Sequence, residues 1–198
     1  MVTPYDWLDS MMWVIVGSAV SLGIMALRLP YKASSDSFEE EGRNLRRGLA
    51  TTIGLSGFYL FITGIAHYFL WPYATLSGGV YNLLFGGAAT IGGLVLIGVS
   101  AALFLNGGLR AISYFAVVMG LYLIVNAASM VNYKLTRDPI LSALLYLAPA
   151  AAAFLSIPYT HIDNKLVKWL FAIFAFLYGV AWLYFAANTT IGHLKPPA

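Results

Sequence analysis

Few side chains in this sequence could do chemistry, and the strongest candidate is His67, which lies in a long apolar stretch. An imidazole inside a membrane can ligate haem or a metal ion. A bis-histidine haem would need a second histidine in the membrane, but His161 and His193 fall in a loop and in the tail. A metal triad would need carboxylates that the apolar stretches lack. The sequence therefore predicts no cofactor and no metal site, and a haem-carrying redox subunit that uses His67 is the alternative function.

A second pattern with catalytic potential is Gly54-Leu55-Ser56-Gly57, which has the form of the nucleophile site in rhomboid intramembrane proteases. The serine of such a site needs a histidine on a later helix as its general base. His67 is eleven residues further along the same predicted helix, which places it about 16 Å away. No catalytic residue is therefore predicted, and a membrane enzyme is kept only as an alternative.

Polar side chains also recur near the end of the fourth apolar stretch. They are separated by four, three and four residues, so they share one face of a helix. Two more polar residues, on the second and third stretches, are predicted near the same side of the membrane. The candidate polar pocket consists of His67, Asn82, Tyr122, Asn126, Ser129 and Tyr133. The alternative is that these side chains bond to neighbouring helices, at about 0.6 kcal/mol each.

The stretches that would position these groups are almost free of charge. Of the 198 residues, 60% are hydrophobic and 10% are charged, against about 25% charged residues in a soluble domain. Six apolar stretches reach the length of about 20 residues that a helix needs to cross a bilayer. They cover residues 11–27, 49–71, 81–105, 111–131, 140–157 and 166–187. The predicted fold is all-α, a polytopic membrane bundle of six transmembrane helices in one domain over residues 1–198.

Composition excludes several other classes of protein. The chain has no cysteine, which removes disulfides, thiol catalysis and thiolate metal sites. Its net charge of +3 comes from scarce acids, and the basic residues form no continuous face, so nucleic acid is not a predicted partner. The spans carry no ionisable Asp, Glu, Lys or Arg at depth, which disfavours ion-coupled carriers.

Basic residues fall mainly in alternate loops. With the amino terminus outside, the inner segments hold eight Lys and Arg and the outer segments hold three, which predicts that both termini lie outside the cell membrane. The longest inner segment covers residues 28–48, and its basic end consists of Arg43, Arg46 and Arg47. These three are candidate contacts for anionic lipid headgroups or a partner, and the alternative is a solvated face that only signals topology.

A weak repeat suggests how the spans are organised. Arg47 and Gly57 recur 63 residues later as Arg110 and Gly120, and Gly179 follows a basic residue in the sixth span. The repeat predicts three parallel helical hairpins, each with a second helix that runs outward from a basic inner end. Small residues crowd the third span, which predicts that this helix is the central packing element of the bundle.

The region over residues 54–86 resembles an archaeal membrane family known only as domain of unknown function 981. The residues that carry the resemblance are Gly57-Phe58-Tyr59, Gly64, Trp71-Pro72 and Tyr81-Asn82-Leu83-Leu84-Phe85-Gly86. The resemblance implies an archaeal plasma-membrane protein and supplies no activity. An acidic residue often follows Phe-Gly in that family, whereas Gly87 stands here, so the resemblance brings no cation site with it.

These observations predict a small channel, a binding or transport protein, or a subunit of a membrane complex. The lipid bilayer is its first partner. Other membrane subunits or further copies of the chain are the candidate protein partners. The alternative from another class is the membrane enzyme or haem-carrying subunit that uses His67.

Overall fold

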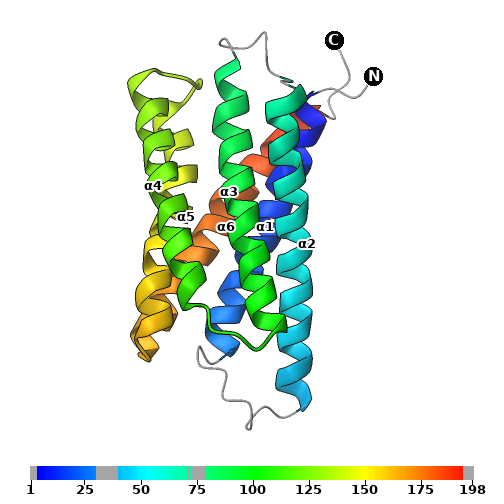
Figure 1. The fold of residues 1–198 in the computed structure, drawn as a ribbon. Helices are drawn as coiled ribbons and strands as arrows, with labels where there is room; N and C mark the ends of the chain where they lie inside the picture. Colours follow the sequence, from blue (N-terminus) through cyan, green and yellow to red (C-terminus); the bar gives the residue numbers. More distant parts are fainter. Residues whose placement is uncertain (1–3, 30–39, 71, 73–78, 194–198) are drawn as a thin grey trace.

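The computed structural model describes residues 4–29, 40–70, 72 and 79–193, and this part of the chain forms six helices (Figure 1). The helices are α1 (Pro4–Arg28), α2 (Glu40–Leu70), α3 (Val80–Phe104), α4 (Arg110–Asn132), α5 (Pro139–His161) and α6 (Lys165–His193). All six are long and apolar enough to cross a membrane. The prediction of an all-α bundle with six membrane spans is confirmed. Most helix ends lie beyond the predicted spans, because a helix can continue past the hydrocarbon core, whereas α2 ends at Leu70 and α3 at Phe104, each one residue short of the prediction.

The six helices form a closed ring in chain order. Each helix contacts the one before and after it, and α6 closes the ring against α1. Three pairs pack most extensively, namely α2–α3, α4–α5 and α1–α6, whereas the α3–α4 contact is the least extensive of the six. We call the end where α1 begins and α6 ends the terminal end, and the end where α2 and α4 begin the basic end (Figure 1).

Glycines of the repeat explain which helices pair. A Cβ added at Gly57 of α2 would lie 2.8 Å from backbone atoms of α3. At Gly120 of α4 it would lie 3.2 Å from Ala153 of α5, and at Gly179 of α6 it would lie 3.2 Å from Ala19 of α1. Each glycine therefore lies against the partner helix of its own pair. The repeating unit is thus a helix and its successor, with α1 serving as the successor of α6.

The contact between α2 and α3 is the closest in the ring. A Cβ at Gly93 would lie 2.5 Å from the backbone nitrogen of Phe61, and one at Gly64 would lie 2.5 Å from that of Thr90. Small residues permit this approach of two backbones. However, α3 is one member of the ring, with α2 and α4 beside it. The prediction that α3 is the central packing element was therefore wrong, because the centre of the ring holds a cavity instead.

Local sequence sets several helix ends. Asp138 accepts a hydrogen bond from the backbone N–H of Leu141 at 3.2 Å, and Pro139 follows at the first position of α5, which is the usual start of a helix. Before α3, Gly79 has a φ of 81°, a conformation that glycine adopts without a steric penalty.

Candidate functional site

The ring encloses an elongated cavity of about 140 Å³. On α1 its wall is a single stripe that consists of Leu8, Met11, Ile15, Ser18, Leu22 and Met25. The stripe covers 17 residue steps, or about 25 Å of helix. Because a hydrocarbon core is about 30 Å thick, the cavity follows most of the membrane thickness.

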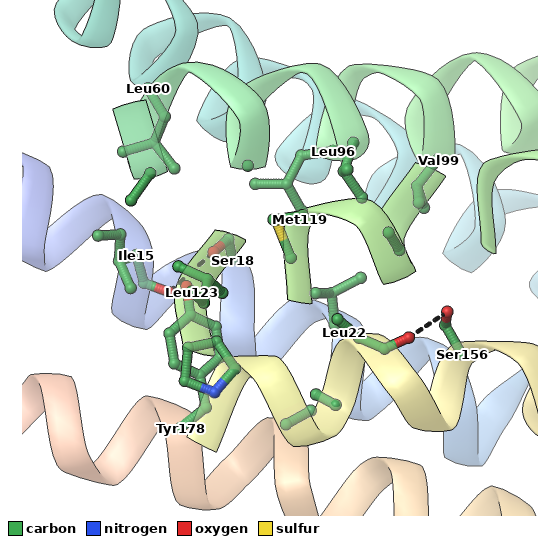
Figure 2. Close-up of a pocket in the computed structure, with 18 of the residues that line it drawn as sticks. Ile15, Ser18, Leu22, Leu60, Leu96, Val99, Met119, Leu123, Ser156 and Tyr178 are labelled. Atoms are coloured by element: carbon green, nitrogen blue, oxygen red, sulfur yellow. Dashed lines mark hydrogen bonds between the residues drawn. The ribbon is translucent and has the colours of Figure 1, made fainter. Parts of the chain in front are cut away.

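Most of the cavity wall is apolar. Figure 2 shows Leu60, Leu96, Met119 and Leu123 around the space, with Tyr178 at one side. Small residues on α3 and α5 leave the room for it, among them Ala88, Ala89, Gly92, Ala152 and Ala153. A cavity lined by such groups stays dry and takes up apolar molecules.

Hydroxyl groups gather in the cavity wall near the basic end. We call Ser113, Ser156 and Thr160 the hydroxyl cluster; all three are buried and line the cavity. Ser156 Oγ donates to the carbonyl of Ala153 at 2.6 Å, and it also lies 3.3 Å from the Ser113 carbonyl (Figure 2). Thr160 Oγ1 lies 3.1 Å from Ser113 Oγ, which donates to the Arg110 carbonyl at 2.7 Å. The hydroxyl hydrogens therefore already have acceptors within the protein.

Aromatic side chains line the cavity near the terminal end. The rings of Tyr146 and Trp182 lie 6.4 Å apart and both are buried. Trp182 Nε1 donates to the Leu145 carbonyl at 3.2 Å, and Tyr146 Oη donates to the Leu84 carbonyl at 3.4 Å. Because these polar atoms are bonded to backbone, the rings present mainly apolar surface to the cavity.

The predicted polar pocket is only partly assembled. Tyr122 and Asn126 lie together on α4, and the Tyr122 hydroxyl donates to the Leu83 carbonyl of α3 at 3.0 Å. A Cβ at Gly87 would overlap Tyr122 Oη and lie 2.8 Å from Tyr68 Oη. The two hydroxyls thus occupy the space above this glycine. Sequence reasoning missed Tyr68, since nothing in its spacing links it to the fourth span.

Asn126 is a nearly buried polar side chain beside Tyr122. It is 7% exposed and interacts with the hydroxyl of Tyr122. Ser129 Oγ donates within its own helix to the Val125 carbonyl at 2.8 Å, and Tyr133 is 74% exposed. Neither of these two side chains is drawn into the contact between Tyr122 and Tyr68.

His67 and Asn82 are completely buried at the terminal end of the α2–α3 pair. Nδ1 of His67 lies 2.8 Å from the Thr63 carbonyl, and its ring makes an edge contact with Trp7 of α1 at 6.5 Å. A Cβ at Gly86 would lie 2.8 Å from His67 Cβ. The imidazole is therefore packed where α1, α2 and α3 meet.

The remaining chemical candidates are spread along the bundle. His161 lies at the basic end, where its Nε2 is 3.0 Å from Tyr114 Oη. It is thus at the opposite end of the bundle from His67, and the side chain of His193 is outside the described residues. Within the described part of the chain, no group of three or more His, Cys, Asp or Glu could hold a metal ion. The two glycines around Ser56 contact α3, so helix packing accounts for that pattern.

Two of the three basic candidates for lipid contact are exposed. Arg43 and Arg47 face away from the bundle, whereas Arg46 is 8% exposed and its Nε donates to the Leu103 carbonyl at 2.9 Å. The last carbonyls of a helix lack partners within that helix, and Arg46 supplies one to α3. Arg46 is therefore directed into the bundle and away from a headgroup.

Six apolar helices around a largely apolar cavity define a multi-pass membrane protein. Residues 1–196 match the model of a family described as "Protein of unknown function (DUF981)", and the chain belongs to this family. No curated protein and no solved structure matches the chain. The family resemblance seen in the sequence is confirmed, and the family description supplies no activity.

Proposed function

We propose that this protein binds or transports an apolar molecule, which occupies the central cavity, and that it does so without covalent chemistry. The observation that carries this proposal is the cavity itself, which is apolar over most of its wall and follows most of the membrane thickness. In a membrane, an apolar molecule can enter such a space from the surrounding lipid.

The cavity favours binding over ion conduction. A channel replaces the hydration shell of an ion with carbonyl oxygens or charged side chains, and hydrophobic constrictions block ions by losing water. Among the described residues the cavity wall carries no charged side chain. Its serine and threonine hydroxyls donate to carbonyls of their own helices. The binding option is therefore preferred to the channel option.

The setting of this activity follows from the charge pattern and the family. With more basic residues at the basic end, that end faces the cytoplasm and both termini face outward. The family resemblance supports an archaeal plasma membrane as the proposed location. A role as the lipid-binding subunit of a larger membrane complex is compatible with the same cavity.

The test is to fill the cavity and measure binding. Purified protein is titrated with a long-chain alkyl bromide, whose bromine quenches tryptophan fluorescence. Because the chain has five tryptophans, the signal of Trp182 in the cavity wall is taken as the difference between the wild type and Trp182→Phe. Ala116 lines the cavity and is buried, so Ala116→Leu should weaken binding about tenfold through overpacking. Ala128 lies on the same helix and is exposed, so Ala128→Leu is the matched control.

Two results would contradict the proposal. The first is equal binding to the wild type and the Ala116→Leu variant. The second is an ion flux in liposomes that falls when Asn126 is changed, because such a flux would favour a channel. For the alternative that uses His67, a Soret absorption band that is lost in His67→Ala would support haem.

A further inference from the structure

We infer that the cavity binds an extended chain that ends in a hydrogen-bond donor, such as a long-chain alcohol, with this end at the hydroxyl cluster of Ser113, Ser156 and Thr160. The inference rests on the proposed function and specifies its ligand. It follows from the shape of the cavity, the chemistry of the hydroxyl cluster and the contrast between the two ends of the cavity.

The shape of the cavity favours a linear hydrocarbon chain as the ligand. A compact apolar cavity of about 150 Å³ holds one benzene ring. The cavity here has a similar volume, about 140 Å³, but its wall on α1 runs from Leu8 to Met25, a length of about 25 Å. The same volume over that length leaves room for a narrow, extended molecule. A single hydrocarbon chain fits this description, and a fused ring system does not.

The hydroxyl cluster indicates which polar group one end of the ligand carries. A hydroxyl has one hydrogen to donate and two lone pairs that can accept. The Ser156 hydrogen is directed to backbone carbonyls, and among the described residues no donor reaches Ser156 Oγ. The cluster can therefore accept a hydrogen bond from a ligand far more readily than donate one. An alcohol satisfies this requirement, whereas an ether of the same length does not.

The aromatic side chains at the terminal end of the cavity set the orientation of the bound ligand. Trp182 and Tyr146 have their polar atoms bonded to the carbonyls of Leu145 and Leu84, so this end offers no free polar group to the ligand. Tyr146 and Ser156 are ten residues apart on α5, or about 15 Å along the helix. The methyl end of the chain should therefore lie near Trp182 and the hydroxyl end near Ser156.

Position-dependent quenching tests this orientation. Two primary alcohols of equal chain length are compared, one brominated at the end far from the hydroxyl and one brominated next to it. The signal of Trp182 is isolated as the difference between the wild type and Trp182→Phe. The alcohol with the distant bromine should quench Trp182 more strongly. Equal quenching by the two alcohols, or the reverse order, would overturn the inferred orientation.

Removal of the acceptor tests the chemistry. Ser156→Ala should weaken binding of the alcohol about threefold to tenfold, the usual contribution of one hydrogen bond, and should leave binding of the matching methyl ether unchanged. Ser100→Ala is the matched control, because Ser100 is buried, donates to the Ala50 carbonyl at 2.7 Å and does not line the cavity.

The outcomes separate the two proposals. If neither the alcohol, the ether nor the alkyl bromide quenches Trp182, the proposed function fails. If all three bind the wild type with equal affinity, the cavity binds apolar chains but the inference about the donor end is wrong. Retained helicity and unfolding temperature in Ser156→Ala show that any loss of binding is not a loss of fold.

Discussion

The α2–α3 and α4–α5 pairs are built on the same plan. In each pair an arginine near the start of the first helix donates to a carbonyl near the end of the second. Arg46 Nε reaches the Leu103 carbonyl at 2.9 Å, and Arg110 Nε reaches the Thr160 carbonyl at 3.4 Å. Each arginine thus bonds to a carbonyl in the last turn of its partner helix.

A serine of the second helix repeats the pattern. Ser100 donates to the Ala50 carbonyl at 2.7 Å, and Ser156 lies 3.3 Å from the Ser113 carbonyl. The two pairs differ in how closely their backbones approach and in whether their polar side chains line the cavity. The α2–α3 backbones touch along their length, whereas Ser113, Ser156 and Thr160 of the other pair line the cavity. The same packing arrangement gives a close helix contact in one pair and part of the cavity wall in the other.

The largest change in stability should come from the glycines at the helix contacts, because these contacts are closer in the α2–α3 pair than in the α4–α5 pair. Gly93→Ala would place a methyl group 2.5 Å from a backbone nitrogen of α2 and 2.6 Å from the Gly57 carbonyl. Backbone cannot move aside cheaply, so we expect a loss of about 3 kcal/mol in the free energy of unfolding. Gly120→Ala meets Ala153 and the Ala150 carbonyl at 3.2 and 3.3 Å and should lose less than about 1 kcal/mol.

Unfolding in mild detergent, followed by circular dichroism, measures both variants. Gly92→Ala is the control within α3, because its nearest neighbour would be Met119 Sδ at 3.5 Å, an ordinary contact. Equal losses of unfolding free energy in Gly93→Ala and Gly120→Ala would show that the two helix pairs do not differ in how closely their backbones approach.

The arginines should give the next largest difference. Arg46 is buried, and Arg46→Ala leaves the Leu103 carbonyl without this donor, which should cost about 2 kcal/mol of unfolding free energy. Arg110 is exposed and its bond is longer, so Arg110→Ala should cost less than about 1 kcal/mol. The exposed Arg43 is the control for loss of charge. An Arg46→Ala variant as stable as Arg43→Ala would count against this contrast.

The serines should give the smallest change in stability and the clearest change in binding. Ser100→Ala and Ser156→Ala each remove one interhelical bond, worth about 0.6 kcal/mol in a membrane. Only Ser156→Ala should reduce the rise in unfolding temperature that a long-chain alcohol causes. Differential scanning fluorimetry with and without the alcohol measures both quantities. An equal reduction in the two variants would remove the distinction between the pairs.

The sequence predicts those features that depend on local composition. Scarce charge predicts the six spans, and the recurrence of Arg47 and Gly57 as Arg110 and Gly120 predicts a repeat. The repeat glycines do lie at the helix contacts, but the pairing of α6 with α1 joins the two ends of the chain. No local pattern specifies such a contact.

The site was harder to predict for a related reason. Helical spacing groups Tyr122 with Asn126, but it cannot show that Tyr68 of another helix reaches the space above Gly87. The cavity depends on how six helices close into a ring, so its lining appears in the sequence only as small and apolar residues. The inward direction of Arg46 likewise depends on where α3 ends.

Occupation of the cavity by an alkyl chain is tested most directly by a crystal structure of the protein with a long-chain alcohol that carries bromine at its far end. Anomalous scattering locates the bromine without assumptions about the chain. We expect a bromine peak inside the ring, beside Trp182 and Tyr146. Bromine peaks only on the outer faces of the helices, with the cavity free of ligand density, would contradict it.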